Sequence, residues 1–348
     1  MKKRKCGNSS LELPLLGIGC WSFGGGSYWG EQDQRDVDVV VHRALDIGCD
    51  FFDTAEAYND GASEESLGKA LKGRRSQATI GSKISPSNTA PEVLREHCEA
   101  SLRRLQTDYI DLYMIHWPIH PHSIRHFTDD ETVINNPPST ATAFETLIKL
   151  REEGKIRYIG VSNFGVQQLT EALDIGAEIV SNELPYSLLT RAIDKGILPL
   201  CQERSIGILA YMPLMQGLLA GKYETSDDVP SIRARTRHFS GSRPHARHKE
   251  PGAEGLTFAA ISRIKAIAGE QDISMAHLAL AWCMANPGIT CVLVGARNVS
   301  QLESNAQAAS LSLHVELIEE LNVVTIPLLE RLGSSPDYYE NTAMSRAW

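Results

Sequence analysis

Long apolar runs are missing from this sequence of 348 residues. No stretch approaches the ~20 apolar residues of a membrane-spanning helix, and the basic start MKKRKCGNSS precedes no apolar signal segment. An excess of positive charge is also missing, because the net charge is −9 and the pI about 5.7, which argues against nucleic-acid binding. The seven cysteines lack paired spacing and are expected to be reduced thiols. We therefore expect a soluble, cytoplasmic protein that acts on small molecules.

Two common functional motifs are absent as well. Gly17 and Gly19, followed by the triplet at residues 24–26, lack the full spacing of a dinucleotide-binding fingerprint, and no helix opens directly after them. No Gly-x-Ser-x-Gly sequence follows a predicted strand, so the nucleophile elbow of a serine hydrolase is missing. A doubly wound dinucleotide fold and hydrolytic chemistry are therefore disfavoured.

Strand-like and helix-like segments alternate along the chain. The candidate strands are the apolar or β-branched runs at residues 15–21, 49–55, 78–84, 110–117, 158–164, 178–186, 206–214 and 290–296. Amphipathic stretches lie between them at 36–48, 91–105, 143–155 and 166–176, with Gly48, Gly154 and Gly176 as stop signals. Eight such repeats indicate a parallel sheet closed into a (β/α)8 TIM barrel. We predict one domain over residues 1–348, with a capping β-hairpin at residues 2–14 and long loops over the C-terminal face.

Four residues with complementary chemistry lie where predicted strands run into loops, and they are Asp53, Tyr58, Lys83 and His116. Active sites of such barrels lie at the C-terminal ends of the strands, so these side chains are expected to meet there. Tyrosine, with a usual pKa near ~10, needs a neighbouring lysine that lowers its pKa if it is to act as a general acid. The aspartate keeps that lysine charged, and the imidazole can hydrogen-bond a carbonyl oxygen. Each residue alone also has an ordinary structural explanation, but together they indicate carbonyl reduction.

Several ordered motifs resemble those of the aldo-keto reductase family over nearly the whole chain. They are LGIGCW, FDTAEAY, GSK, DLYMIHWP, GKIRYIGVSNF, PYSLLTR, GLLAGKY and GARNVSQLESN. The resemblance places Asp53, Tyr58, Lys83 and His116 on the family's catalytic tetrad, with Tyr58 as the general acid. It also implies a nicotinamide dinucleotide across the mouth of the barrel that passes a hydride to a carbonyl carbon.

The same resemblance implies the cofactor contacts. Ser162 and Asn163 match the pair that hydrogen-bonds the nicotinamide carboxamide, and Tyr186 matches the aromatic residue that stacks on the ring. The loop at residues 212–223 matches the one that approaches the pyrophosphate, and residues 295–305 match the region that holds the adenosine. The candidates are Trp21, Ser162, Asn163, Glu183, Tyr186, Leu214, Gly217, Lys222, Arg233, Gly295, Ala296, Arg297, Gln301 and Asn305.

Two of these positions bear on cofactor choice. Glu183 stands where the family usually has glutamine, and a carboxylate there accepts a hydrogen bond, donates none and brings negative charge near the ring. Arg297 is a candidate partner for a 2′-phosphate, although a surface arginine is often simply solvated. The expected cofactor is therefore NADPH/NADP+, with NADH as the alternative.

Aromatic residues and long loops are expected to shape the substrate pocket. The aromatic candidates are Trp21, Tyr28, Trp29 and Trp117. The insertion at residues 119–138 follows a predicted strand end and should overhang the mouth. A second long stretch, at residues 227–255, either attracts phosphates or an acidic substrate or is a solvated loop. Its cations are Arg233, Arg235, Arg237, Arg243, Arg247 and Lys249.

No metal site is predicted. The insertion carries histidines and aspartates, but their spacing matches no ligand geometry and the expected reaction needs no Lewis-acid metal. These residues are His120, His122, His126, Asp129 and Asp130.

Two alternative functions remain open from the sequence. Potassium-channel β-subunits resemble aldo-keto reductases, so the chain is either an enzyme or a cofactor-sensing regulatory subunit. An NAD-dependent sugar or polyol dehydrogenase on the same scaffold is the second alternative. The natural substrate and the oligomeric state leave no readable pattern.

Overall fold

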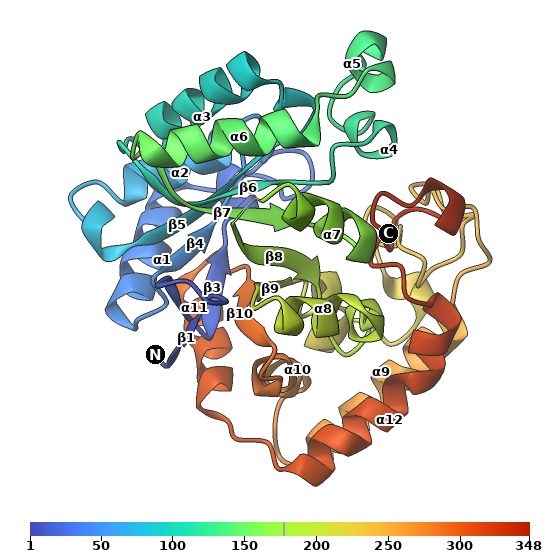
Figure 1. Ribbon diagram of the computed structural model, residues 1–348. Coiled ribbons are helices and arrows are strands. Elements are labelled where there is room, and N and C mark those ends of the chain that lie inside the picture. Colours follow the sequence, from blue (N-terminus) through green and yellow to red (C-terminus); the bar gives the residue numbers. More distant parts are fainter. Residues whose placement is uncertain (177) are drawn as a thin grey trace.

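The computed structural model describes residues 1–176 and 178–348 and shows a closed barrel of eight parallel strands (Figure 1). Its strands adjoin in the order β10-β3-β4-β5-β6-β7-β8-β9. Each overlaps one of the eight predicted runs, with β7 and β10 beginning two residues and one residue before theirs, so the predicted (β/α)8 barrel is confirmed. Their bounds are β3 (Leu16–Gly19), β4 (Phe51–Asp53), β5 (Thr79–Ile84), β6 (Ile110–Ile115), β7 (Ile156–Ser162), β8 (Ile179–Pro185), β9 (Gly207–Tyr211) and β10 (Ile289–Val294).

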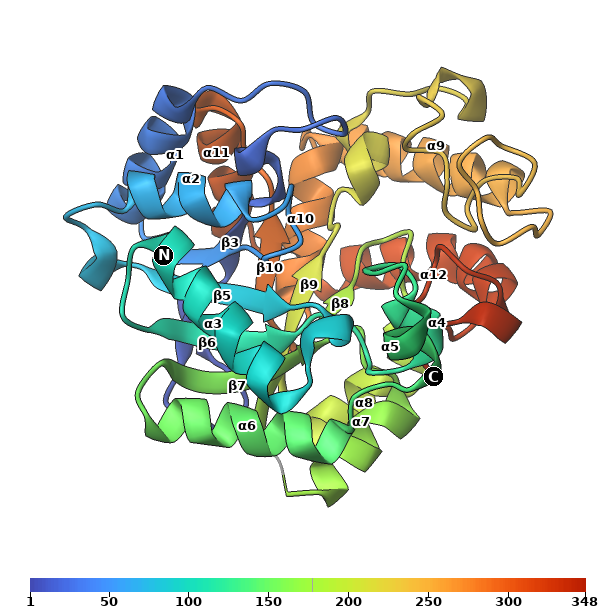
Figure 2. The ribbon, with the colours of Figure 1, turned by 90° about the horizontal axis from the view of Figure 1, so that it is seen from above.

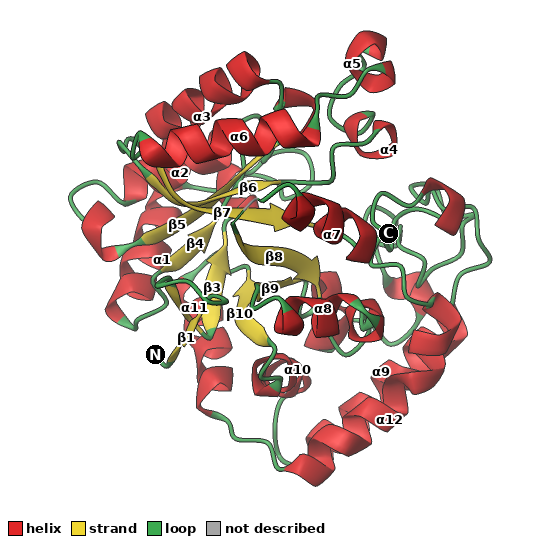
Figure 3. Cartoon of the chain, viewed as in Figure 1, coloured by secondary structure: helices red, strands yellow, loops and turns green. Residues whose placement is uncertain are grey.

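Helices cover the outside of the barrel (Figure 3). They are α1 (Gln34–Asp46), α2 (Ala62–Ala70), α3 (Pro91–Leu105), α4 (Pro121–Ile124), α5 (Glu131–Asn135), α6 (Thr140–Glu152), α7 (Val166–Asp174), α8 (Ile197–Glu203), α9 (Glu254–Glu270), α10 (Met275–Ala285), α11 (Val299–Gln307) and α12 (Val315–Leu332). Gly48, Gly154 and Gly176 follow α1, α6 and α7 with φ of 78°, 77° and 80°, a left-handed backbone that ends a helix. Among the described residues, no helix combines the length and apolarity required to cross a membrane.

A β-hairpin closes the N-terminal end of the barrel. Strands β1 (Lys3–Lys5) and β2 (Glu12–Pro14) pair antiparallel, and Cys6, Leu11 and Leu13 pack against apolar side chains inside the barrel. The guanidinium of Arg4 donates to the carbonyl oxygens of Met284 and Asn286, both at 2.9 Å, just before β10. The predicted hairpin is therefore confirmed.

All seven cysteines are buried and none forms a disulfide. They are distributed over strands, helices and the hairpin, at Cys6, Cys20, Cys49, Cys98, Cys201, Cys283 and Cys291. Burial raises the pKa of each thiol, because the charged thiolate loses its hydration. The cysteines therefore serve as small apolar core residues in this fold.

Two long segments approach the C-terminal mouth of the barrel. One is the basic loop, residues 229–253, and the other is the tail segment, residues 333–348, which follows α12 (Figures 1 and 2). Three cations of the basic loop are paired with carboxylates: Arg237 with Glu250 at 2.9 Å, Arg243 with Glu254 at 2.6 Å, and Arg247 with Glu340 at 2.6 Å. Glu250 of the loop itself, Glu254 at the start of α9 and Glu340 of the tail segment thus supply counter-charges to these three arginines.

Candidate active site

The four predicted catalytic residues come together at the carboxyl ends of neighbouring strands. Asp53 is the last residue of β4, Lys83 lies one residue before the end of β5, and His116 directly follows β6. The Nζ atom of Lys83 lies 2.5 Å from Oδ1 of Asp53 and 3.2 Å from the hydroxyl oxygen of Tyr58. The ammonium group also donates to the carbonyl oxygen of Thr54 at 3.1 Å. A single buried cation thus links the aspartate to the phenol.

A second carboxyl group reaches the same lysine. Oε2 of Glu183, on β8, lies 3.3 Å from Nζ of Lys83, and both side chains are almost completely buried. Burial raises the pKa of Glu183 well above its usual range, and the charge of Asp53 raises it further. Burial alone would lower the pKa of Lys83, but the charges of Asp53 and Glu183 hold that pKa well above its usual value. Lys83 therefore stays protonated and positively charged.

The phenol of Tyr58 keeps its proton in this environment. Burial raises its pKa above the usual value, and the charge of Lys83 lowers it without outweighing burial. The expectation that Lys83 brings the pKa of Tyr58 below its usual value is therefore wrong for this structure. The physical reason is that Asp53 already balances the charge of Lys83, while the phenol lies in a poorly hydrated cluster.

The imidazole of His116 lies beside this phenol. The two ring centroids are 5.6 Å apart in an edge-to-face arrangement, and the ring of Phe127, from the insertion after β6, lies 5.6 Å away from His116 on another side. Burial, followed by the charges of Lys83 and Arg346, lowers the pKa of His116 well below its usual value. Its Nδ1 atom is buried and has no hydrogen-bond partner among the described residues. The neutral ring therefore has an unused nitrogen.

The predicted carboxamide-binding pair is held next to His116. Ser162 ends β7, and Asn163 follows it with a left-handed backbone, φ 64°. Nδ2 of Asn163 donates to the carbonyl oxygen of His116 at 3.1 Å and to Oγ of Ser162 at 2.9 Å. Oδ1 of Asn163 accepts a hydrogen bond of 2.7 Å from the hydroxyl of Tyr211, the last residue of β9. The pair is therefore fixed in orientation from two strands.

Tyr186, predicted to stack on the nicotinamide, does not lie in this cluster. Its ring is buried and stacks on Trp282 of α10 with centroids 5.1 Å apart, and its hydroxyl accepts a hydrogen bond from Nδ2 of Asn286. Packed against α10, the ring is not available to a ligand at the mouth, which corrects the prediction. Tyr211 is the tyrosine that the barrel brings beside Asn163, and its place at a strand end was the available signal.

Aromatic side chains form one wall beside Tyr58. Trp21 lies in a short 3-10 helix, η1 (Trp21–Gly24), and its ring stacks on Tyr28 with centroids 4.9 Å apart. The ring of Trp29 meets Trp21 edge-to-face at 5.3 Å, and Tyr58 lies 6.0 Å from Trp21. Trp117, the fourth predicted pocket residue, is instead covered by the guanidinium of Arg346, 3.7 Å above its ring centroid.

The loop after β9 gathers the predicted pyrophosphate contacts. Leu214 precedes a second 3-10 segment, η5 (Met215–Ala220), and Gly217 within it has φ 100°, which favours glycine. A Cβ atom at Gly217 would lie 3.8 Å from Cδ of Lys222 and 3.9 Å from Nη1 of Arg233. Arg233 has no carboxylate partner in the described part of the chain and donates to the hydroxyl of Tyr223 at 3.2 Å. The side chains of Lys222 and Arg233 therefore lie next to backbone that carries no side chain at Gly217.

The predicted adenosine region lies between β10 and α11. Gly295 and Ala296 follow β10, and the carbonyl of Gly295 accepts from Asn305. Oε1 of Gln301 accepts from the backbone N–H of Arg297 at 2.9 Å. The guanidinium of Arg297 donates to Oε1 of Gln32 at 2.8 Å and to the carbonyl of Trp29 at 2.9 Å. A cavity of about 260 Å³ adjoins this corner, lined by Glu31, Gln32, Asp33, Asp36, Arg297, Asn298 and Gln301. These acceptors and the carbonyl of Glu31 hold the guanidinium of Arg297 in place and use three of its five N–H donors.

The histidines of the insertion contact the tail segment. The rings of His120 and His122 meet edge-to-face with centroids 4.7 Å apart, and the ring of Trp348 lies 4.6 Å from His120. Nε2 of His126 lies 3.4 Å from Oε1 of Glu340. Over the described ranges, no three His, Cys, Asp or Glu side chains gather closely enough to hold a metal ion.

A buried cluster of acidic, basic and aromatic side chains thus lies at the mouth of a parallel barrel. Residues 15–325 match the family model described as the aldo/keto reductase family. The chain belongs to this family. This match covers nearly the whole barrel and agrees with the sequence motifs that carry the resemblance.

Relatives of this aldo/keto reductase differ in what their names state. The Bacillus subtilis protein named aldo-keto reductase YhdN is 31% identical, with 97% of this chain and 96% of that protein covered. The Escherichia coli protein named NADH-specific methylglyoxal reductase is also 31% identical, over 90% and 95%. The Arabidopsis thaliana protein named probable voltage-gated potassium channel subunit beta is 29% identical, over 96% and 97%.

A solved structure shares the fold of this aldo/keto reductase. It is the crystal structure of an aldo/keto reductase from Klebsiella pneumoniae in complex with NADP and acetate. It is 29% identical, covers 93% of this chain and 96% of its own, and has a TM-score of 0.69.

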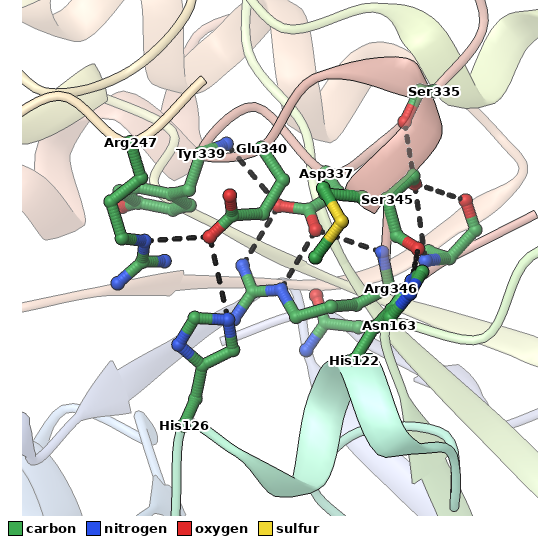
Figure 4. Close-up of polar contacts among 12 residues, drawn as sticks. His122, His126, Asn163, Arg247, Ser335, Asp337, Tyr339, Glu340, Ser345 and Arg346 are labelled. Atoms are coloured by element: carbon green, nitrogen blue, oxygen red, sulfur yellow. Dashed lines mark hydrogen bonds and ion pairs between the residues drawn. The ribbon is translucent and has the colours of Figure 1, made fainter. Parts of the chain in front are cut away.

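In this aldo/keto reductase ion pairs hold the tail segment in place (Figure 4), and the guanidinium of Arg346 within it covers Trp117. Nε and Nη2 of Arg346 both donate to the carboxylate of Asp337 at 2.8 Å, and the backbone N–H of Arg346 donates to it at 3.0 Å. Next to this pair, Glu340 accepts from Arg247 of the basic loop and contacts His126 of the insertion. Three segments that are distant in sequence are therefore joined above the mouth.

Asp337→Asn is expected to loosen this tail segment. Burial raises the pKa of Asp337, but the hydrogen bonds and charge of Arg346 outweigh it and hold that pKa below its usual value, so the pair is ionised. Hydrogen bonds to a charged group contribute about 1.5–3 kcal/mol, so the backbone amides of the tail should exchange with deuterium roughly tenfold faster or more. The folded-state pKa of Asp337 lies below its usual value. In the unchanged protein, the protection of the tail amides from exchange is therefore present above the usual pKa and is lost as the pH falls through the folded-state pKa.

The matched control is Asp227→Asn. Asp227 pairs with Arg243 at 3.2 Å, but its side chain is 91% exposed, so the same substitution should leave tail exchange unchanged. Equal exchange in Asp337→Asn and the unchanged protein would show that the ion pair does not hold the segment.

Proposed function

We propose that this chain reduces an aldehyde or a ketone, with sugar-like carbonyl compounds among the candidates, to an alcohol with a nicotinamide dinucleotide as hydride donor. The observation that carries the proposal is the position of Lys83, whose Nζ contacts both Asp53 and the hydroxyl of Tyr58 at the carboxyl ends of β4 and β5. This arrangement provides a protonated phenol with a cation beside it, which is the requirement for donating a proton to a carbonyl oxygen at neutral pH.

The residues present fit a nicotinamide cofactor. Nδ1 of His116 is a buried polar atom without a hydrogen-bond partner in the described residues, and so is Oε2 of Glu183 apart from its 3.3 Å ion contact with Lys83, although buried polar groups are normally hydrogen-bonded. Polar groups of a ligand at the mouth would satisfy them. Ser162 and Asn163 are held next to His116, while Lys222 and Arg233 flank Gly217 in the loop after β9 and would suit a phosphate-bearing part. When bound, the reduced cofactor would supply the hydride.

The protein side chains supply the proton and the orientation. The neutral imidazole of His116 hydrogen-bonds the carbonyl oxygen and holds it near the hydroxyl of Tyr58. As negative charge grows on that oxygen, the phenol transfers its proton to it. Lys83 stabilises the resulting phenolate, and Asp53 keeps Lys83 oriented. Solvent then returns a proton to Tyr58, and the alcohol leaves.

Both forms of the cofactor are candidates in this proposal. The Klebsiella structure supports NADP, and the Escherichia coli relative, named as NADH-specific, supports NADH. Near the expected adenosine end, Glu31, Asp33 and Asp36 line the cavity next to Arg297. Carboxylates there would repel a 2′-phosphate, so we propose that NADPH is accepted with NADH as a real competitor.

The test is consumption of reduced cofactor, followed by near-ultraviolet absorbance, with aldehydes, 2-oxoaldehydes, ketoses and aromatic ketones, using NADPH and NADH in parallel. Turnover of at least one carbonyl class is the expected result. Tight cofactor binding without turnover of any compound would contradict the enzyme assignment and favour the regulatory alternative, which the channel-subunit relative suggests. Oxidation of sugars or polyols with NAD+ that far exceeds carbonyl reduction would favour the dehydrogenase.

We also propose that residues 1–348 act as one catalytic unit. The hairpin packs inside one end of the barrel, and the tail segment packs over the other, so both segments outside the family match of residues 15–325 are joined to the barrel.

A further inference from the structure

Lys83 lies between two buried carboxyl groups, so two groups that can be negatively charged share one positive charge. Nζ of Lys83 lies 2.5 Å from Oδ1 of Asp53 and 3.3 Å from Oε2 of Glu183. All three side chains are at most 5% exposed. If both carboxyl groups were ionised, the cluster would carry an uncompensated negative charge away from water, which is costly. One carboxyl group therefore retains a proton.

The contacts indicate that the proton is on Glu183. Asp53 makes the shorter ion pair with Lys83, while Oε2 of Glu183 has no hydrogen-bond partner in the described residues. Burial and the negative charge of Asp53 both favour the neutral form of Glu183. A protonated carboxyl group has one donor and one acceptor, so it presents nearly the same hydrogen-bonding groups as the glutamine that the family usually has here.

We propose that Glu183 is a proton-binding residue of the cofactor site, and that loss of its proton favours the oxidised over the reduced nicotinamide. The inference rests on the proposed function, because it needs a nicotinamide ring near β8. The oxidised ring carries a positive charge and the reduced ring does not. An ionised Glu183 therefore attracts only the oxidised ring, whereas a neutral Glu183 makes little distinction between them.

Other titratable groups face Glu183 across the mouth of the barrel. They are Asp53 from β4, Tyr58 from the loop after β4, Lys83 from β5 and Tyr211 from β9. Glu183→Gln leaves all four in place and removes one ionisable group of the same size. The difference between the unchanged protein and this variant therefore isolates the proton on Glu183.

The experiment measures the Kd of the oxidised and of the reduced cofactor by tryptophan fluorescence, between about pH 6 and pH 9, with NADP+ and NADPH and then NAD+ and NADH. In the unchanged protein, the ratio of oxidised to reduced Kd should fall about tenfold over this range, because ionisation of Glu183 is linked to binding of the cationic ring. In Glu183→Gln the ratio should stay level. The 2′-phosphate titrates equally in both redox forms of a pair and cancels.

A second measurement needs no variant. Binding of the oxidised cofactor should release more protons than binding of the reduced one, measured by calorimetry in buffers with different ionisation enthalpies. A control variant is Glu64→Gln, which changes a buried carboxyl group that is bonded to Arg104 and Ser82 instead of Lys83. It should keep the pH dependence of the unchanged protein.

The outcomes separate the inference from the proposed function. A ratio that is independent of pH in the unchanged protein, or a pH dependence that persists in Glu183→Gln, would overturn the role of Glu183 while cofactor binding stands. Failure of all four cofactors to bind the unchanged protein would overturn both. Because Gln matches Glu in size and keeps a donor toward Asp53, we expect thermal melting to show that Glu183→Gln is folded. If the variant is not folded, the proton-release measurement on the unchanged protein decides.

Discussion

Replacing Tyr58 with phenylalanine is expected to lower carbonyl reduction by a factor of roughly 10²–10⁴, because proton donation in the transition state contributes about that much. The ring, which packs beside Trp21 and His116, remains, so the fold and the Kd of the reduced cofactor should change little. Steady-state turnover and fluorescence titration of the same preparation provide the two readouts. Since only the hydroxyl is removed, kcat should fall more than KM changes.

Tyr158→Phe is the matched control for this variant. Tyr158 lies on β7 and its hydroxyl contacts Oγ of Ser10 at the hairpin, at the other end of the barrel. The same atom is removed, but turnover should remain within about twofold because a surface substitution of this kind costs little. Full activity in Tyr58→Phe would remove the basis for the proposed function.

Lys83→Met is expected to abolish turnover and also to destabilise the fold. Without the ammonium group, Asp53 and Glu183 are two buried carboxyl groups without a cation, and breaking a buried ion pair costs about 3–5 kcal/mol. The loss depends on pH with a definite sign. In the variant, burial raises the folded-state pKa of both carboxyl groups above their unfolded values. The penalty is therefore small below the unfolded pKa and grows as the pH rises toward the folded pKa.

The measurement is the urea midpoint of Lys83→Met at about pH 5 and about pH 8, where the larger loss is expected at the higher pH. Lys69→Met is the control, because Lys69 forms an exposed pair with Glu65 at 4.0 Å and contributes little. A loss that is equal at both pH values would indicate that the hydrophobic packing of the Lys83 stem, rather than its charge, holds the cluster.

Much of the fold could be predicted because its signals are local. The eight strands are apolar on both faces, since helices cover the outside and side chains fill the inside, and such runs are visible without any knowledge of contacts. Asp53, Lys83 and His116 could be placed because a parallel barrel brings all carboxyl ends of its strands to one mouth. The hairpin was visible from the Gly-Asn-Ser turn.

Features that depend on distant segments were harder to predict. Tyr186 and Tyr211 both follow apolar runs, and only the packing of α10 shows that Tyr186 faces away from the mouth. Three arginines of the basic loop have counter-charges, and the partner of Arg247, Glu340, lies about a hundred residues further along the chain. The pKa of Tyr58 depends on the balance between burial and Lys83, which spacing alone does not reveal.

Closure of the barrel between its first and last strands has a consequence for synthesis of the protein. β3 pairs with β10, and Arg4 of the hairpin bonds to carbonyl groups just before β10, so these partners are separated by more than 250 residues. Until β10 emerges from the ribosome, β3 and β9 have unpaired edges and the hairpin lacks the carbonyl groups that Arg4 binds. Open strand edges on a nascent chain are sites of aggregation. The barrel can therefore close only when translation is nearly complete, and its two open strand edges need protection until then.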